Sequence, residues 1–225
     1  MTNGALTGKQ AFIWDLDGTL LDSYGVIVSS LHRAYLEAGL TLDKDEILRE
    51  IISQTVSYFT RKMENERGIA FETIKERYSE ISEQEKLNIK PIKNASEILS
   101  FLNDRGIPNY VFTHRGVSTE PILKNIGLYG FFDEIVTGKD GFGRKPDPSA
   151  LNYLVQKYNL DKNSTFYVGD RSLDIECANN AGLMSILYLP EDSAAKPTGK
   201  ETFIVKDLLE IRDIVSGKRD DDDAG

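Results

Sequence analysis

After Pro91 the sequence alternates between short apolar runs and stretches in which apolar residues recur at helical spacing. The apolar runs are rich in aromatic and β-branched residues and end at polar residues or glycine, which is typical of buried strands. With one earlier run of the same kind, we predict strands at residues 11–15, 109–113, 134–138, 165–170, 184–189 and 202–205. Strands that alternate with helices form parallel sheets, because each crossover between parallel strands needs a long connection, usually a helix.

The segment between the first two predicted strands has a different pattern, with helical spacing throughout. Apolar residues recur at that spacing over residues 27–38, and Asp43 with Glu46 three residues later indicates the start of a second helix. Similar patterns cover residues 55–66 and 72–87. The expected fold class is therefore α/β, a Rossmann-like parallel sheet with helices on both faces plus an inserted all-helical cap.

These patterns divide the chain into two expected domains and a tail. Residues 1–22 and 89–217 are predicted to form the α/β core, and residues 23–88 the helical cap. Residues 218–225 read "KRDDDDAG", a block of charge that predicts a disordered acidic tail and not a metal site.

The composition excludes several classes of function. A formal net charge of -9 argues against a nucleic-acid-binding surface, because phosphate backbones are bound by clustered Lys and Arg side chains. No stretch approaches the roughly 20 apolar residues of a membrane span, and the N-terminus lacks the apolar core of a signal peptide. The one cysteine, Cys177, cannot form an internal disulfide and is predicted to be buried. We expect a soluble, cytoplasmic monomer or homodimer with no nucleic-acid or membrane partner.

Polar residues gather where the predicted strands end or in the loops that follow them. There are four such groups: Asp15 with Asp17, Thr113 to Arg115, Lys145, and Asp170 with Asp174. The carboxyl ends of parallel strands lie at one edge of the sheet, which is where such sheets bind ligands. We therefore expect the four groups to lie together.

Several carboxylates in one partly buried cleft repel one another unless a cation lies among them. Mg²⁺ accepts one or two carboxylates and completes its coordination with water and a substrate phosphate. Lys145 offers a point charge for that phosphate, Thr113 offers a hydroxyl donor, and the turn amides at 16–17 and 114–115 can bind phosphate oxygens. The segment "GKDGFGRK" lacks the spacing of phosphate-binding and dinucleotide-binding glycine loops. The cluster therefore predicts Mg²⁺ as cofactor and a phosphorylated substrate.

The segments "DLDGTLLDS", "VFTHR", "RKPDP" and "GDRSLD" occur in this order, with the helical insertion after the first. They resemble the four signature motifs of the haloacid dehalogenase superfamily, and the resemblance covers residues 11 to about 190. The place of the helical insertion resembles the cap of the branch that contains phosphoglycolate phosphatase and β-phosphoglucomutase.

The resemblance implies a role for each matching residue. Asp15 would be the nucleophile that forms an aspartyl-phosphate, and Asp17 would act as general acid and base while its backbone carbonyl contacts Mg²⁺. Asp170 would bind the metal directly, and Asp174 would bind it directly or support it through water. The implied site residues are, for catalysis, Asp15, Asp17, Thr113 and Lys145; for phosphate binding, Thr113, His114, Arg115 and Lys145; and for the metal, Asp15, Asp17, Asp170 and Asp174.

Within the phosphate-binding set, the resemblance makes Thr113 a phosphate ligand and Lys145 the residue that neutralises charge. His114 also has an ordinary structural interpretation, because a histidine after a strand is more often structural, and we assign it no catalytic role. Its neighbour Arg115 offers a positive charge at the same loop.

Departures from other branches favour a phosphatase. Dehalogenases of the superfamily lack the second aspartate, present here as Asp17, and P-type ATPases have lysine in its place. β-Phosphoglucomutases usually have valine at the position of Thr19 and histidine at the position of Ile27. The predicted function is a Mg²⁺-dependent phosphatase that hydrolyses a small phosphorylated metabolite, a phosphomonoester, through an aspartyl-phosphate intermediate. The alternatives are a phosphomutase of the β-phosphoglucomutase type and a catalytically silent binding protein on the same fold.

Overall fold

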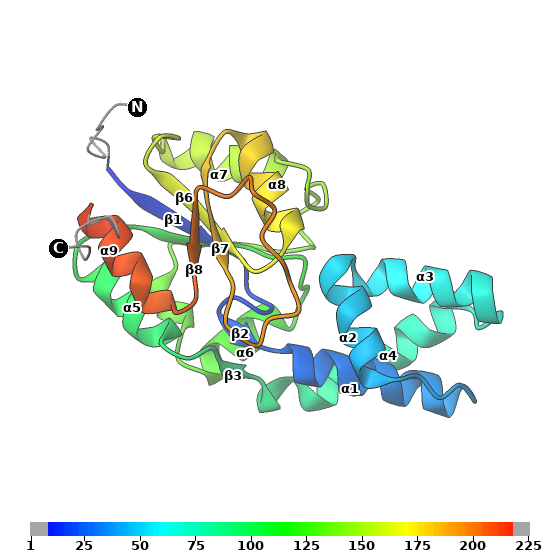
Figure 1. The fold of residues 1–225 in the computed structure, drawn as a ribbon. Helices are drawn as coiled ribbons and strands as arrows, with labels where there is room; N and C mark the ends of the chain where they lie inside the picture. Colours follow the sequence, from blue (N-terminus) through cyan, green and yellow to red (C-terminus); the bar gives the residue numbers. More distant parts are fainter. Residues whose placement is uncertain (1–8, 218–225) are drawn as a thin grey trace. The chain divides into compact units, whose positions relative to one another are not determined.

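The computed structural model describes residues 9–217, and the chain divides into two compact units. One unit takes Met1–Leu20 and Pro91–Gly225, and the other takes Leu21–Lys90. The first unit is an α/β unit and the second is helical (Figure 1). The predicted disordered tail, residues 218–225, lies outside the described residues.

Within the described residues, the first unit contains a six-stranded parallel sheet. Its strands are β1 (Ala11–Trp14), β4 (Asn109–Phe112), β5 (Glu134–Val136), β6 (Thr165–Gly169), β7 (Met184–Tyr188) and β8 (Phe203–Val205). Their order across the sheet is β5-β4-β1-β6-β7-β8, and every neighbouring pair is parallel. The predicted strands and the α/β class are confirmed, and the first strand along the chain lies in the interior of the sheet.

Helices cover both faces of this sheet. α5 (Ala95–Asn103) and α9 (Ile211–Ser216) cover one face, whereas α7 (Ser149–Tyr158) and α8 (Ser172–Ala181) cover the other (Figure 1). α6 (Thr119–Asn125) comes between β4 and β5 along the chain. Short 3₁₀ turns complete the described connections at Tyr129–Phe131 and Leu208–Glu210.

Side chains of β1, β4 and β6 alternate between the two faces of the sheet and are buried on both. Ile13 and Tyr167 join Cys177 in the core beneath α7 and α8, and Cys177 is fully buried, as predicted. Phe12 is also fully buried, and its ring stacks on that of Phe166 with the centroids 4.9 Å apart. Burial on both faces explains why the strands read as continuous apolar runs and not as alternating ones.

The second unit contains the inserted helices, α1 (Tyr24–Glu37), α2 (Lys44–Ser53), α3 (Val56–Arg67) and α4 (Phe71–Glu85). They enclose a core of their own, in which the rings of Tyr35 and Phe59 meet edge to face at 5.9 Å. Asp43 caps α2 as predicted, because its carboxylate accepts the N–H of Glu46 at 2.8 Å. Residues 9–217 include no helix that is both long enough and apolar enough to cross a membrane.

The chain leaves the α/β unit and returns to it through two adjacent segments. β2 (Leu21–Asp22) and β3 (Lys90–Pro91) pair as a two-stranded ribbon. Next to this ribbon and within the α/β unit, the N–H of Ile92 donates to the carbonyl of Leu20 at 2.9 Å. The two ends of the insertion are therefore held together by the main chain.

Two helix starts differ in detail from the sequence prediction. The pair Asp147-Pro148 predicts a helix cap followed by the first helical residue, but α7 begins one residue later, at Ser149, whose N–H donates to Asp147 at 2.8 Å. Asn94, with Glu97 three residues later, predicts the cap of α5, but Asn94 adopts a left-handed conformation, with φ 66°, and makes no side-chain cap bond. Its amide instead donates to the carboxylate of Asp207 at 2.8 Å, because the end of β8 lies beside it in the fold.

A buried hydrogen bond between two strands gives a test of the core. The indole N–H of Trp14 on β1 donates to Oδ1 of Asn109 on β4 at 2.9 Å, and both side chains are fully buried. Asn109→Ala removes this acceptor and leaves a small void, so the free energy of unfolding in urea should fall by about 2–3 kcal/mol. The matched control is Asn163→Ala at an exposed turn, where a change below about 0.5 kcal/mol is expected. Equal effects of the two variants would contradict a stabilising role for the buried pair.

Candidate active site

Three neighbouring strands end at the candidate site. β1 is followed by Asp15, β4 by Thr113 and β6 by Asp170. The register pairs the last residue of β1 with Val111 on one side and Val168 on the other. The N–H of Asp15 continues the pairing by donating to the carbonyl of Val168 at 2.8 Å, so this aspartate is fixed by the sheet itself.

The structure brings three of the predicted metal ligands together. One carboxylate oxygen from each of Asp15, Asp170 and Asp174 lies within 4.8 Å of the others, and all three residues are buried. Asp15 and Asp170 come from strand ends, whereas Asp174 comes from the first turn of α8. Only a short loop separates the end of β6 from α8, so Asp174 in the first turn of α8 lies at the same edge of the sheet.

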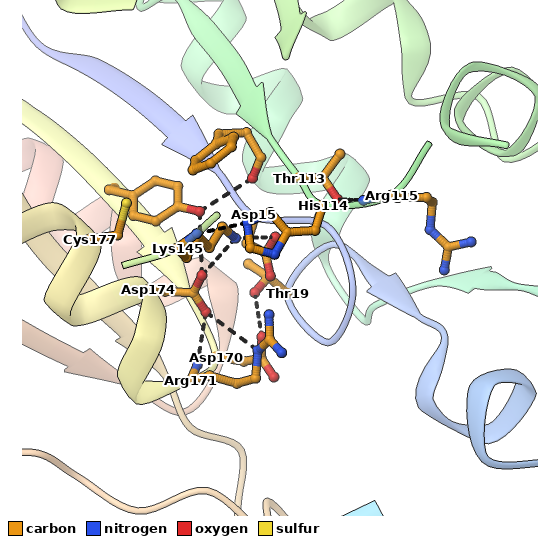
Figure 2. Close-up of polar contacts among 12 residues, drawn as sticks. Asp15, Thr19, Thr113, His114, Arg115, Lys145, Asp170, Arg171, Asp174 and Cys177 are labelled. Atoms are coloured by element: carbon orange, nitrogen blue, oxygen red, sulfur yellow. Dashed lines mark hydrogen bonds and ion pairs between the residues drawn. The ribbon is translucent and has the colours of Figure 1, made fainter. Parts of the chain in front are cut away.

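Lys145 lies between two of these carboxylates (Figure 2). Its Nζ donates to Oδ1 of Asp15 at 2.6 Å and to Oδ1 of Asp174 at 2.7 Å, and its side chain is fully buried. The same nitrogen lies 5.2 Å from the ring centroid of Phe112 and 5.3 Å from that of Tyr167. Two carboxylates and two aromatic rings therefore surround a single ammonium group.

Burial and charge act in opposite directions on this cluster. Burial raises the pKa of Asp15 to about 6, although the charge of Lys145 favours the ionised form. Burial also acts to raise the pKa of Asp174, but the charges of Lys145 and Arg171 outweigh it and lower that pKa. Burial acts to lower the pKa of Lys145, and the two carboxylates outweigh it and raise that pKa. Asp15 is therefore the carboxylate of this pair whose negative charge the protein stabilises least.

One carboxylate oxygen in the cluster is left without a protein partner. Oδ2 of Asp15 is buried and accepts no hydrogen bond within residues 9–217. By contrast, both oxygens of Asp174 accept protein donors, one of them the N–H of Arg171 at 3.1 Å, and Asp170 accepts the hydroxyl of Thr19 at 3.2 Å. A buried anionic oxygen without a partner is costly unless a ligand binds to it, and clustered carboxylates are the ligands that Mg²⁺ prefers. The residues present fit a magnesium ion.

Asp17 has a different setting from the buried cluster. Its Oδ1 pairs with the guanidinium of Arg115, and its side chain is 23% exposed. Thr113 is buried at the end of β4, where its hydroxyl accepts the N–H of Arg115 at 3.1 Å. Figure 2 shows the Arg115 side chain directed away from Asp15 and Lys145. The assignment of Arg115 to phosphate binding stays a prediction, and in the structure this side chain engages a carboxylate.

His114 contacts the loop that carries Lys145. Its Nε2 accepts the backbone N–H of Lys145 at 2.9 Å, and its ring meets that of Phe112 edge to face at 5.7 Å. Burial, with the positive charges of Lys145 and Arg144, lowers the pKa of His114 to about 3. The ring is therefore neutral near pH 7, as an acceptor nitrogen must be. The assignment of His114 to phosphate binding likewise stays a prediction.

Three residues that support the cluster, Thr19, Arg171 and Tyr167, are not among the site residues predicted from the sequence. Thr19 and Arg171 lie inside the quoted motifs, so their positions beside the acidic residues offered a signal. Tyr167 offered none, because it reads as one more apolar residue of a strand. Its hydroxyl lies 3.3 Å from the carbonyl of Phe112 and 3.4 Å from Oδ1 of Asp174. It thus joins the end of β4 to the start of α8.

Gly169 allows α8 to approach the end of β6. A Cβ at this position would lie 2.3 Å from Cβ and 2.4 Å from Cγ of Asp174, much closer than carbon atoms approach. Gly169→Ala should therefore displace Asp174 and lower the free energy of unfolding in urea by about 1–3 kcal/mol. The matched control is Gly130→Ala, where no atom lies within 4 Å of the added methyl group. A variant at Gly169 as stable as this control would show that α8 can move away without cost.

The low pKa of His114 predicts a dependence of stability on pH. As the pH falls below 6.5, His114 in the unfolded chain gains a proton, whereas the folded protein binds that proton only near pH 3. The unfolded state holds more protons between these values, so His114 lowers the free energy of unfolding as the pH falls through this range. Above pH 6.5 both states are neutral at this residue and the effect is absent.

His114→Gln keeps an acceptor but cannot titrate. The decrease in unfolding free energy between pH 8 and pH 4 should therefore be smaller in this variant than in the wild type. Urea unfolding of both proteins at the two pH values measures the difference. The same decrease in both would mean that His114 titrates alike in the folded and unfolded chains.

Known proteins match this chain over most of its length. The family model of haloacid dehalogenase-like hydrolases matches residues 12–188. A phosphoglycolate phosphatase of Vibrio parahaemolyticus is 25% identical over 218 residues, covering 90% of this chain and 94% of the relative. An N-acetylmuramic acid 6-phosphate phosphatase of Pseudomonas putida is 25% identical over 214 residues, covering 92% of this chain and 96% of the relative. The crystal structure of a predicted phosphoglycolate phosphatase from Haemophilus somnus has a TM-score of 0.84 at 23% identity, covering 94% of this chain and 100% of that one, and so shares its fold.

The span matched by the family model runs from β1 to the end of β7. It includes the strand ends that carry Asp15, Thr113 and Asp170, the loop of Lys145 and the first turn of α8. By sequence, fold and arrangement of these acidic residues, this chain belongs to the haloacid dehalogenase-like hydrolase family.

Proposed function

We propose that this protein is a Mg²⁺-dependent phosphatase that hydrolyses a small phosphorylated metabolite through an aspartyl-phosphate on Asp15. The observation that carries the proposal is the buried cluster of Asp15, Asp170 and Asp174, in which Lys145 pairs with Asp15 and Asp174 and Oδ2 of Asp15 has no partner among the described residues. Two relatives are a phosphoglycolate phosphatase and an N-acetylmuramic acid 6-phosphate phosphatase, and their names support small phosphomonoesters as the substrate class.

In the proposed reaction a carboxylate oxygen of Asp15 attacks phosphorus, and the new O–P bond forms as the ester P–O bond breaks. Asp17 gives a proton to the leaving oxygen and later removes one from the water that hydrolyses the aspartyl-phosphate. Thr113 donates a hydrogen bond to a phosphoryl oxygen, and the ammonium of Lys145 compensates its negative charge. All four residues lie in the proposed core, residues 1–22 and 89–217.

The carboxylates of Asp15 and Asp170, with the backbone carbonyl of Asp17, would hold the magnesium ion. Asp174 would bind it directly or support it through water, and the protein donors already present at both of its oxygens favour the second role. When bound, Mg²⁺ supplies a fixed positive charge that stabilises the phosphoryl oxygens during transfer.

The proposal predicts activity that depends on the metal. The purified protein should hydrolyse p-nitrophenyl phosphate with Mg²⁺, lose this activity in EDTA and regain it when Mg²⁺ is restored in excess. Asp15→Asn replaces the attacking carboxylate by an amide of similar shape, so it should abolish turnover without loss of the folded state. A panel of phosphorylated metabolites, compared by kcat/KM, then identifies the substrate class.

Two results would contradict the proposal in different ways. Folded protein with no Mg²⁺-dependent turnover of any phosphomonoester would favour the silent binding protein. Accumulation of an isomer, in place of free phosphate, from a sugar 1-phosphate would favour the mutase.

A further inference from the structure

The loop that carries Lys145 is held to other elements by side chains that bond to its main chain. Each of three successive residues in this loop makes one such contact. The contacts are Lys145 N–H to Nε2 of His114 at 2.9 Å, Nδ2 of Asn180 to the carbonyl of Pro146 at 3.0 Å, and Sγ of Cys177 to the carbonyl of Asp147 at 3.3 Å. His114 follows β4, whereas the other two side chains belong to α8. The contact made by His114 is the one at the lysine itself.

We propose that His114 is a positioning residue for Lys145, and that it acts by accepting the backbone N–H from which the lysine side chain extends. The expected effect of His114 on turnover rests on the proposed function. The expected effect of His114 on the position of the Lys145 side chain does not.

The geometry at the lysine Nζ makes such an anchor necessary. This nitrogen donates at 2.6 and 2.7 Å to carboxylates that come from different elements, β1 and α8. A lysine side chain has several rotatable bonds, so a shift of its backbone by about 1 Å can break both contacts or weaken them together. The hydrogen bond from the backbone N–H of Lys145 to His114 limits how far the backbone of Lys145 can shift.

His114 is itself held in place. Its ring packs on Phe112, whose ring also faces the lysine ammonium, so two residues from the end of β4 contact Lys145 at its backbone and at its Nζ. Behind them, a Cβ at Gly138 would lie 2.6 Å from the carbonyl oxygen of His114, and the N–H of Gly138 donates to the carbonyl of Arg115 at 3.0 Å. The main chain after β5 therefore packs directly against the main chain of His114.

The chemistry of the imidazole suits an acceptor better than a phosphate ligand here. Burial and the positive charges of Lys145, Arg144 and Arg171 oppose protonation of the ring, whereas Asp174 favours it. With Nε2 engaged by the lysine N–H, a neutral ring has one donor left, at Nδ1. A direct contact with phosphate would have to use that single donor or give up the bond to the loop.

The first experiment measures the place of Lys145 without turnover. Trace acetylation of the Mg²⁺-free protein, followed by mass spectrometry, reports how accessible each lysine amine is. His114→Phe keeps an aromatic ring but removes the acceptor, and should raise labelling of Lys145 by roughly 10-fold or more. His114→Gln places an oxygen near the position of Nε2 and should restore the low labelling of the wild type.

Two controls separate this effect from a general loosening. Lys162, an exposed residue whose amine donates to the carbonyl of Ala181 at 2.6 Å, should label equally in all variants. Asn180→Ala removes the neighbouring contact to the loop at an exposed position, and should raise labelling of Lys145 by no more than about 3-fold. Low labelling of Lys145 in His114→Phe, or a rise shared with Lys162, would overturn the proposal.

The second experiment is a double-mutant cycle with Lys145→Met. If His114 acts through the lysine, His114→Phe should lower kcat for p-nitrophenyl phosphate by roughly 10- to 100-fold in the wild-type background. In the Lys145→Met background it should lower kcat by less than about 3-fold. Equal losses in both backgrounds would show that His114 does not act through Lys145 and would overturn the proposal. A wild-type protein without turnover would contradict the proposed function alone, and the labelling of Lys145 would still decide the role of His114.

Discussion

The contact of one buried ammonium, Lys145, with the carboxylates of Asp15 and Asp174 is the interaction on which the candidate site depends. Removing one partner of a buried ion pair leaves an uncompensated charge in surroundings of low polarity, which is far more costly than losing a surface pair. The contact therefore determines where the loop before α7 must run and how closely α8 must approach β6. Burial acts against this contact and leaves Asp15 with a raised pKa, and Oδ2 of Asp15 accepts no hydrogen bond from the described residues.

The sheet supplies the rigidity that this contact needs. β4, β1 and β6 are neighbours in the interior of the sheet, and both faces of these strands are buried. Their ends can move little without disrupting the core, so Asp15, Thr113 and Asp170 are presented on the most constrained part of the fold. Two residues on loops are then held by bonds to residues at or just after these strand ends. Lys145 bonds to Asp15 and His114, and Arg115 bonds to Thr113 and Asp17.

The fold could be predicted because strands that are buried on both faces of the sheet appear in the sequence as continuous apolar runs, such as the one that ends at Asp15. The gathering of acidic residues followed from the rule that parallel strands share one carboxyl edge. The partners of individual side chains could not be predicted, since spacing along the chain fixes neither rotamers nor the path of a loop. Hence neither the pairing of Arg115 with Asp17 nor the bond of Asn94 to Asp207 could be predicted from the sequence.

The hydrogen bond between Ile92 and Leu20 has a consequence for how this architecture can diversify. Because the α/β unit itself brings these two residues together, most of the entropy of closing the intervening loop is already lost when the sheet forms. The length and content of the inserted segment then matter little to the stability of the sheet, as loop-closure entropy grows only slowly with chain length. A hydrolase scaffold of this kind can thus exchange one insertion for another while the geometry around its aspartates is inherited unchanged.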